Sequence, residues 1–411
     1  MADAPRPKLS EILPLLICGS ATFNNQYNVS VADIPTNVLI ARALKLGVRA
    51  FDTSAYYGPS ETLLGDALAQ PSVQKAFPRE SYMILTKCGR VGLSSFDYSP
   101  AWVRKSVARS LERMRTTYLD AVYCHDVEFV TPEEVVMAIK ELRRLRDEQG
   151  TVRYVGISGY PVHVLVSLAE LVLRETGEPI DIVQSYSNFN VQNTRLLTEG
   201  LEALRTAGVD VVTNASVLSM GLLRHNGVPV GGQGDWHPAP KELRAAVKNV
   251  CDELDKIGEK LESIAIRYAM ESWLRVGSSV GSRGDLALGD ADTNDTKPAV
   301  VISPGQSTRA KLGVTVIGVS KVEELDETMK LWRNVLLTMM SEEDNGRPSR
   351  FATSCGDLNG DHFDAEKGRQ RRDDIVKHAQ ETKELLGQWY DYVWPSPQEG
   401  FINIRHQDSS Q

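Results

Sequence analysis

The chain has 411 residues, 42% of them hydrophobic, with 46 basic and 54 acidic side chains and a formal net charge of -8. These values are typical of a globular protein with a sizeable core, and they argue against a disordered, collagen-like or coiled-coil chain. The acidic balance gives no reason to expect nucleic acid or an anionic membrane as a partner.

The cysteines and the apolar runs predict a cytoplasmic location. The five cysteines are scattered and contain no C-x-x-C pair, as is usual in a reducing compartment. The first residues, MADAPRPKLS, lack the apolar run of a signal peptide, and no stretch approaches the ~20 apolar residues of a membrane helix. We therefore expect a cytoplasmic protein that does not insert into a membrane.

Eight short runs rich in β-branched residues recur along the chain, with amphipathic stretches between them. The predicted strands are residues 14–18, 48–52, 82–86, 121–125, 154–158, 182–185, 209–214 and 314–318. Helical patterns separate them, for example at residues 102–114 and 133–145. Strands joined by crossover helices are parallel, and eight such units favour a single closed (β/α)8 TIM barrel. An open doubly wound sheet is the alternative, but residues 19–23, Gly-Ser-Ala-Thr-Phe, are not its glycine-rich fingerprint.

Two polar stretches interrupt this regular order. We expect the barrel to occupy residues 1–340, with a long mobile insertion at about 277–312 before the last strand. We interpret residues 341–411 as a polar linker followed by a C-terminal helix packed on the barrel. Aromatic residues at the end of the chain more often pack a helix onto a scaffold than form a binding surface. The apolar and aromatic residues assigned to this helix are Ile375, Leu385, Leu386, Trp389, Tyr390, Tyr392 and Trp394.

Four polar residues lie at or just after neighbouring strand ends, where a parallel barrel builds its active site. Asp52 ends the second strand and Tyr57 follows it, Lys87 follows the third, and His125 ends the fourth. Each residue alone has a simpler explanation, because an aspartate can cap a helix, a lysine can be solvated and a histidine can be a core residue. Adjacent strand ends in one barrel would nevertheless bring the four together.

These four residue types predict proton transfer through Tyr57. An ammonium group beside a phenol lowers its pKa, and Lys87 is placed to do this while Asp52 holds Lys87 charged. His125 would orient a substrate oxygen by a hydrogen bond. None of these groups carries electrons, so a redox reaction would need a hydride-carrying cofactor. We predict no metal site, because the seven histidines form no H-x-H pair at a strand end and no H-E-x-x-H motif.

The sequence resembles the aldo-keto reductases through about Lys330. The motifs that carry the resemblance are FDTSAYYGPSE at residues 51–61, LTK at 85–87, LDAVYCH at 119–125 and GTVRYVGIS at 150–158. The resemblance implies a TIM barrel, a nicotinamide cofactor and the catalytic residues Asp52, Tyr57, Lys87 and His125.

The same resemblance implies a set of cofactor contacts. Ser158 and Gln184 match positions that hold the nicotinamide carboxamide, but Gly159 stands where asparagine is usual and Ala215 where an aromatic residue stacks on the nicotinamide. Glu324 stands where NADP-binding members carry arginine, so we expect NAD to be preferred, with NADP as the alternative. The full predicted cofactor set is Thr22, Asp52, Ser158, Gln184, Ser216, Leu218, Gly318, Ser320, Lys321 and Glu324.

The two departures from the family pattern, Gly159 and Ala215, resemble its sugar-oxidising branch, which includes the fungal D-arabinose 1-dehydrogenases and the plant L-galactose dehydrogenases. We therefore expect an NAD(P)-dependent oxidoreductase that converts the C1 hydroxyl of an aldose of the D-arabinose, L-galactose or L-fucose type to a lactone. The alternatives are an NADP-dependent aldehyde or carbonyl reductase, and a cofactor-binding regulatory subunit such as the related β-subunits of potassium channels. The expected partner is a small sugar substrate.

Overall fold

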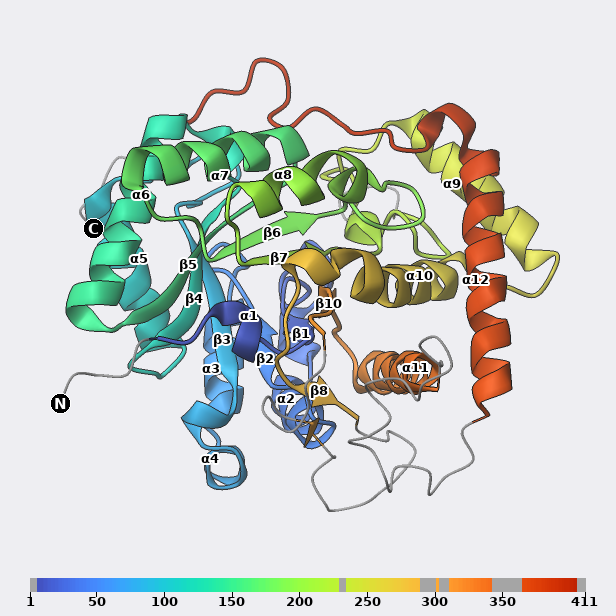
Figure 1. Ribbon diagram of the computed structural model, residues 1–411, viewed down its shortest axis with the longest axis horizontal. Helices are drawn as coiled ribbons and strands as arrows, with labels where there is room; N and C mark the ends of the chain where they lie inside the picture. The colour runs from blue at the N-terminus through green and yellow to red at the C-terminus, as the bar shows by residue number, and fades with distance from the viewer. Residues whose placement is uncertain (1–5, 229–233, 289–300, 303–309, 342–363, 405–411) are drawn as a thin grey trace.

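The computed structural model describes residues 6–228, 234–288, 301–302, 310–341 and 364–404. Eight parallel strands form a closed barrel in the order β1-β10-β7-β6-β5-β4-β3-β2, with helices around it (Figure 1). The prediction of a TIM barrel is confirmed, and each of the eight predicted strands is present. The barrel strands are β1 (Leu16–Gly19), β2 (Ala50–Asp52), β3 (Met83–Cys88), β4 (Leu119–His125), β5 (Val152–Gly159), β6 (Ile182–Tyr186), β7 (Val211–Ala215) and β10 (Val314–Gly318).

Helices follow every strand and cover the outside of the barrel. Capping residues fix where two of these helices begin. Ser99 accepts a hydrogen bond from the Trp102 amide at the start of α5, and Thr131 and Glu134 form a capping box at the start of α6. The helices are α1 (Leu9–Ile12), α2 (Thr36–Lys45), α3 (Ser60–Leu68), α4 (Pro71–Ala76), α5 (Pro100–Arg113), α6 (Pro132–Arg144), α7 (Val162–Thr176), α8 (Leu201–Thr206), α9 (Lys241–Asp255), α10 (Leu261–Val276), α11 (Val322–Met340) and α12 (Ala365–Leu386).

The described ends of the insertion predicted at about 277–312 are packed on the protein. Ser282 and Leu312 pair as an antiparallel bridge, and β8 (Leu286–Ala287) pairs with β9 (Val301–Ile302). Leu286 and Leu288 are both 2% exposed, so burial of these side chains holds the segment. The sequence did not reveal this because two-residue strands are too short to show a period.

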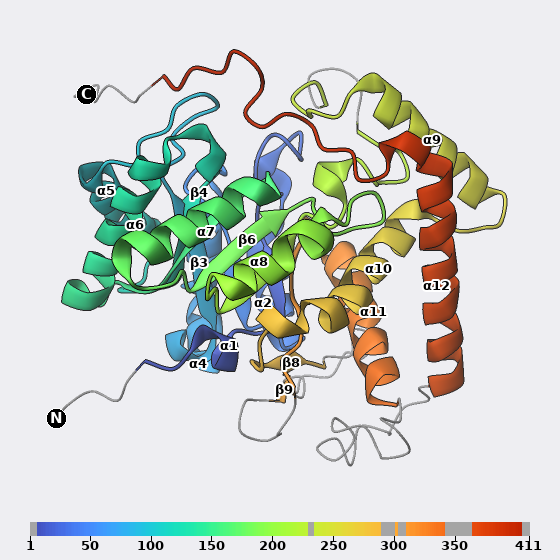
Figure 2. The same cartoon turned by 45° about the horizontal axis from the view of Figure 1, so that its top comes forward.

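The C-terminal region is helical over a shorter span than predicted. α12 packs against α9, α10 and α11 on one side of the barrel (Figure 1). It ends at Leu386, so Trp389, Tyr390, Tyr392 and Trp394 do not belong to it. Trp389 ends a short 3-10 helix, Gly387–Trp389, and the other three lie in the irregular chain that follows. We call residues 387–404 the tail. In Figure 2 the tail leaves α12 beside α9 and runs across the molecule toward α5 and α6.

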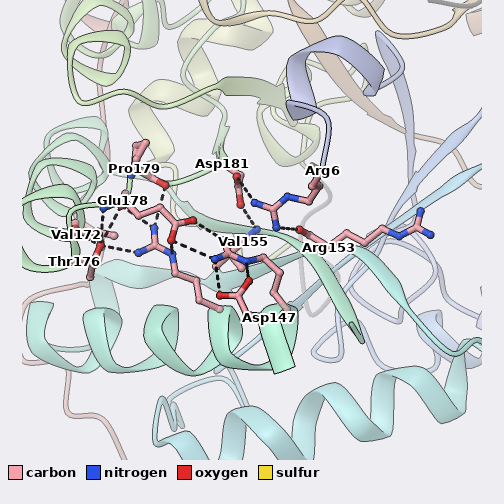
Figure 3. Close-up of polar contacts among 11 residues, drawn as sticks. Arg6, Asp147, Arg153, Val155, Val172, Thr176, Glu178, Pro179 and Asp181 are labelled. Atoms are coloured by element: carbon pink, nitrogen blue, oxygen red, sulfur yellow. Dashed lines mark hydrogen bonds and ion pairs between the residues drawn. The ribbon is translucent and has the colours of Figure 1, made fainter. Parts of the chain in front are cut away.

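The amino ends of the strands carry a network of ion pairs and hydrogen bonds (Figure 3). Arg143 at the end of α6 donates to Thr176 Oγ1 at 2.7 Å and to the Glu178 carbonyl at 2.8 Å, and Arg146 donates to Glu178 Oε1 at 2.6 Å. Arg6 joins the network through Asp181 at 3.6 Å. These contacts tie the ends of α6 and α7 to the segment that enters β6, so this face of the barrel has a structural role.

Candidate active site

The buried pair of Asp52 and Lys87 lies at the carboxyl ends of β2 and β3. Lys87 Nζ donates to Asp52 Oδ1 at 2.6 Å and to the Thr53 carbonyl at 2.9 Å, and the two charged residues are 1% and 3% exposed. Burial raises the pKa of Asp52 above its ordinary value, and the charge of Lys87 opposes that rise. A buried ammonium therefore lies at the place predicted for it.

Tyr57 and His125 lie beside this pair. Lys87 Nζ is 4.9 Å from the centre of the Tyr57 ring, and the Tyr57 and His125 rings meet edge to face with centroids 5.5 Å apart. Ser54 Oγ is 3.0 Å from His125 Nδ1, which fixes the ring and leaves Nε2 for another partner. Burial lowers the pKa of His125 to about 3, so the imidazole is neutral at physiological pH. The four predicted catalytic residues are thus brought together.

The pKa of Tyr57 differs from the expectation. It lies well above the ordinary value, because the hydroxyl is removed from bulk water and because Asp52 and Asp126 disfavour a phenolate. Lys87 does not reverse this, since its ammonium is bound to Asp52 and to a carbonyl oxygen. In the protein alone Tyr57 is therefore a proton donor at neutral pH, and a base only when further positive charge is present.

Ser158 and Gln184 continue the site onto β5 and β6. His125 pairs with Ser158 and Ser158 with Gln184 across adjacent strands, so the three residues form one row. No hydrogen bond within the described part of the chain involves the Ser158 hydroxyl, and the buried Asp52 Oδ2 also has no partner. A hydroxyl and a carboxamide side by side complement a primary amide such as that of nicotinamide. The residues present therefore fit the cofactor that the sequence implies.

The remaining predicted cofactor residues surround the ends of β1, β7 and β10. Thr22 donates to the Val319 carbonyl at 2.8 Å, which joins the loop after β1 to the chain after β10, and Gly318 ends β10. Ser216 has φ 56° and accepts from the Met220 amide at 2.8 Å, while Leu218 is partly buried in the same loop. These residues lie at the same end of the barrel as the four catalytic candidates.

Ser320 and Lys321 directly precede α11, and Glu324 lies in its first turn. The Glu324 carboxylate accepts from the Ser320 amide at 2.9 Å and from its hydroxyl at 3.2 Å, while Lys321 is exposed. Arg224 lies 3.9 Å from Glu324, a cation that sequence reasoning did not place here because it comes from the loop after β7. The negative charge of Glu324 is therefore partly balanced.

The place beside Gly159 is filled by Glu128, a residue that the sequence did not single out. A Cβ atom at Gly159 would meet Glu128 Oε2 at 2.6 Å, so a larger residue at 159 would clash with this carboxyl. Glu128 Oε1 accepts from the Tyr160 amide at 3.2 Å and from Ser396 Oγ at 2.9 Å, while Oε2 is buried without a partner. Burial and the nearby Asp126 raise the pKa of Glu128 to about 8.

The tail covers the loops at this end of the barrel. Trp394 stacks on Tyr160 with centroids 4.7 Å apart and planes at 1°, and Phe401 packs edge-on to Phe129 at 4.9 Å. Asn403 further donates to the Phe96 carbonyl at 3.1 Å. Trp394 and Phe401 therefore pack on the scaffold from irregular chain and not from a helix.

A second charged cluster lies next to His125. Arg90 forms an ion pair with Asp126 and donates to Tyr56 Oη at 3.2 Å, and its guanidinium lies 3.9 Å from the centre of the Tyr56 ring. Asp126 Oδ2 is 3.7 Å from His125 Nε2. The only signal in the sequence is that Asp126 directly follows His125, because the loop that brings Arg90 here shows no pattern.

The described residues contain neither a cluster of metal ligands nor a helix suited to span a membrane. No group of three or more His, Cys, Asp or Glu in those ranges is arranged to hold a metal ion. Among the same residues, no helix has the length and apolar character needed to cross a membrane.

Comparison with known proteins places this arrangement in a family. The model of the aldo/keto reductase family matches residues 15–343. The chain is 39% identical over 320 residues to D-arabinose 1-dehydrogenase of Saccharomyces cerevisiae, which covers 76% of this chain and 91% of that protein. It is 37% identical over 243 residues to L-galactose dehydrogenase of Arabidopsis thaliana, and the match covers 58% of this chain and 71% of that protein.

A solved structure agrees at the level of the fold. The glycerol dehydrogenase of Gluconobacter oxydans superimposes with a TM-score of 0.52 at 18% identity, covering 92% of this chain and 93% of that one. With the barrel, the polar row at its carboxyl end and the family match over residues 15–343, the chain belongs to the aldo/keto reductase family, and it is an oxidoreductase of that type.

Proposed function

We propose that the protein is an NAD(P)-dependent aldose 1-dehydrogenase, which oxidises the C1 hydroxyl of a cyclic aldose to a lactone. The substrate would be of the D-arabinose, L-galactose or L-fucose type. The observation that carries the proposal is the contact of Lys87 with Asp52 at 2.6 Å and with the Tyr57 ring at 4.9 Å, beside a neutral His125. The two aldose dehydrogenases that resemble the chain over most of their length support the choice of substrate class.

The proposed reaction removes two electrons and two hydrogens from the sugar. The C1 hydrogen leaves as a hydride, the hydroxyl proton passes to Tyr57 Oη, and the C1–O bond becomes the lactone carbonyl. His125 Nε2 would hold the reacting oxygen, since Nδ1 is engaged with Ser54. Bound oxidised nicotinamide supplies the hydride acceptor and a positive charge, and such a charge lowers the pKa of a nearby phenol. With that charge present, Tyr57 would release its own proton to solvent more readily than in the protein alone, and the resulting phenolate would accept the proton of the C1 hydroxyl.

The cofactor is proposed to contact the row of Ser158 and Gln184 at its nicotinamide end and the start of α11 at its adenosine end. Thr22, Ser216, Leu218 and Gly318 would line the span between them. Ser320, Lys321 and Glu324 would bind the adenosine end, where a carboxylate favours NAD over NADP. Arg224, 3.9 Å from Glu324, works in the opposite direction and keeps NADP binding as the specific alternative.

A substrate panel tests the function directly. Both enantiomers of arabinose, galactose and fucose are supplied with NAD or NADP, and formation of reduced cofactor is followed by its absorbance. Oxidation of at least one aldose, with lactone as the product, is expected. Rapid reduction of simple aldehydes without aldose oxidation would instead identify a carbonyl reductase. Tight cofactor binding without turnover of any substrate would identify a regulatory subunit.

A further inference from the structure

Arg90, Asp126 and Tyr56 form a polar cluster that the proposed proton transfer does not use. The three residues come from the loops after β3, β4 and β2, and they meet next to the Nε2 atom of His125. Asp126 is 2% exposed and the Arg90 side chain is 16% exposed. Within the described ranges, Asp126 Oδ2 makes the contacts with Arg90 and His125, while Oδ1 has no hydrogen-bond partner.

We expect this cluster to contribute little to the stability of the fold. A buried ion pair contributes little net stability, because desolvation of both charges offsets their attraction. Asp126 also adopts left-handed backbone angles, φ 56° and ψ 62°, directly after the strand that ends in His125. Phe96 and Phe129 support the guanidinium, with ring centres 5.5 and 5.9 Å away. Residues from three separate loops are therefore held in place around a charged pair whose benefit to stability is small.

We propose that Asp126 and Arg90 bind the C2 hydroxyl of the aldose, next to the reacting C1 oxygen. This inference rests on the proposed function and deepens it, because it assigns substrate recognition to residues outside the four catalytic candidates. The carboxylate would accept the hydrogen bond of the hydroxyl, and the guanidinium would donate to its oxygen. Sugar hydroxyls both donate and accept, and a charged pair satisfies both needs at once.

The distances around His125 support this assignment. A substrate oxygen that accepts from Nε2 lies about 3 Å from it, and Asp126 Oδ2 is 3.7 Å from the same nitrogen. A hydroxyl on the next carbon, one bond from C1, then comes within reach of the carboxylate. The guanidinium of Arg90 lowers the pKa of Asp126 against the effect of burial, so the group is an acceptor throughout the physiological range.

Such a pair would discriminate between substrate classes. A simple alcohol or aldehyde offers no second hydroxyl, and its binding would leave Asp126 Oδ1 without a hydrogen-bond partner. Sites built to bind a hydroxyl reject analogues that lack it, because desolvated polar groups are then unpaired. The cluster therefore explains a preference for sugars over simple carbonyl compounds.

The test compares D-arabinose with 2-deoxy-D-ribose, its counterpart without the C2 hydroxyl, in wild type, Asp126→Asn and Arg90→Gln. If D-arabinose is not oxidised, L-galactose and 2-deoxy-L-galactose are used. A charge-assisted hydrogen bond corresponds to about 10- to 100-fold in kcat/KM. We expect wild type to lose about that factor with the deoxy sugar, and each variant to lose less than about threefold.

Matched measurements separate the possible outcomes. The exposed pair of Arg115 and Asp66, 2.5 Å apart on the protein surface, supplies Asp66→Asn as a control that should keep the wild-type discrimination. The dissociation constant of the cofactor, measured by fluorescence, should be unchanged in Asp126→Asn. An undiminished penalty in both variants would overturn the proposal. Equal losses on both sugars with a shifted pH profile would overturn it too, by showing that Asp126 acts through His125. Absence of oxidation of every aldose by wild type would instead refute the proposed function itself.

Discussion

Lys87 is held by Asp52 more closely than it approaches Tyr57. The ammonium donates to Asp52 and to a carbonyl oxygen, while the phenol ring lies 4.9 Å away. Replacing Lys87 would leave Asp52 as a buried, unpaired charge, and such changes commonly cost several kcal/mol of stability. Among the residues that the structure describes, the Tyr57 hydroxyl has no such structural partner, so its replacement gives the cleaner test of proton transfer.

Tyr57→Phe should lower turnover by about 10²- to 10⁴-fold while leaving cofactor affinity nearly unchanged. The reason is that only the group that exchanges a proton is removed, and the ring that faces Lys87 and His125 stays. Steady-state kinetics and cofactor titration measure the two quantities. Tyr82→Phe, which removes the hydroxyl of another tyrosine with low exposure (6%), serves as the control. Turnover in Tyr57→Phe within a factor of a few of wild type would show that another residue transfers the proton.

Glu324→Gln should improve NADP binding by about tenfold, which corresponds to ~1.4 kcal/mol. A carboxylate near a 2'-phosphate repels it, and the glutamine keeps an acceptor for the Ser320 amide and hydroxyl. The neighbouring Glu323 is exposed, so Glu323→Gln supplies the control. The measurement is the dissociation constant of NAD and of NADP in wild type, Glu324→Gln and Glu323→Gln. Identical NADP affinities in both variants and wild type would place the adenosine end elsewhere.

At the scale of elements, the tail is joined to the site through Glu128. This carboxyl binds Ser396 of the tail and the Tyr160 amide at the end of β5. Trp394 stacks on Tyr160 and is 4% exposed, which adds apolar burial to the polar contact. The position of the tail therefore depends on a buried acid whose pKa is raised to about 8.

Glu128 should make the protein less stable as the pH rises. The folded protein keeps a proton on this group up to about pH 8, whereas the unfolded chain releases it near 4.5. Between these values the folded state binds more protons, so the free energy of unfolding falls with increasing pH. Burial lowers the pKa of His125 from 6.5 to about 3, so the titration of this group changes the stability only below about pH 6.5.

Thermal unfolding of wild type and Glu128→Gln between pH 6.5 and 8.5 tests this expectation. Glutamine retains an acceptor for Ser396 and Tyr160 but does not titrate. The melting temperature of wild type should fall more steeply with pH than that of the variant. Parallel curves for the two proteins would mean that Glu128 is already ionised in the folded state.

The elements were more predictable than the connections between them. Buried parallel strands such as Ala121 to His125 form apolar runs that can be recognised locally, and polar residues at their ends follow by topology. Arg90, Glu128 and Arg224 were missed, because each enters the site through a loop whose path depends on tertiary packing. The end of α12 at Leu386 was missed for a related reason, since Trp394 is held by Tyr160, far away in the sequence.

At the scale of the whole molecule, the barrel separates stability from chemistry. The network of Arg143, Arg146 and Glu178 lies at the amino ends of the strands (Figure 3). The groups proposed to bind sugar and cofactor all lie at the opposite ends. A change at one face should therefore leave the other largely unaffected.

Arg143→Met should lower the free energy of unfolding by about 2–4 kcal/mol, because Arg143 is 7% exposed and three partly buried acceptors lose their donor. At a temperature where the variant is folded, kcat/KM should match that of wild type. Arg174, with a side chain 66% exposed and paired with Glu175, provides Arg174→Met as a control with little effect. A large loss of kcat/KM in folded Arg143→Met would contradict the separation of the two faces.

The closure of the barrel by β10 has a consequence for synthesis on the ribosome. β1 and β7 both pair with β10 (Val314–Gly318), and β10 follows β7, the preceding strand of the barrel, by about a hundred residues of chain. Until that segment emerges, a nascent chain holding the complete sequence of Asp52, Tyr57, Lys87 and His125 presents two unpaired strand edges. Such edges recruit other chains, and slow synthesis of the 277–312 region would prolong their exposure. Chaperone demand should therefore peak late in translation, after the residues of the reaction centre have been made and before they can function.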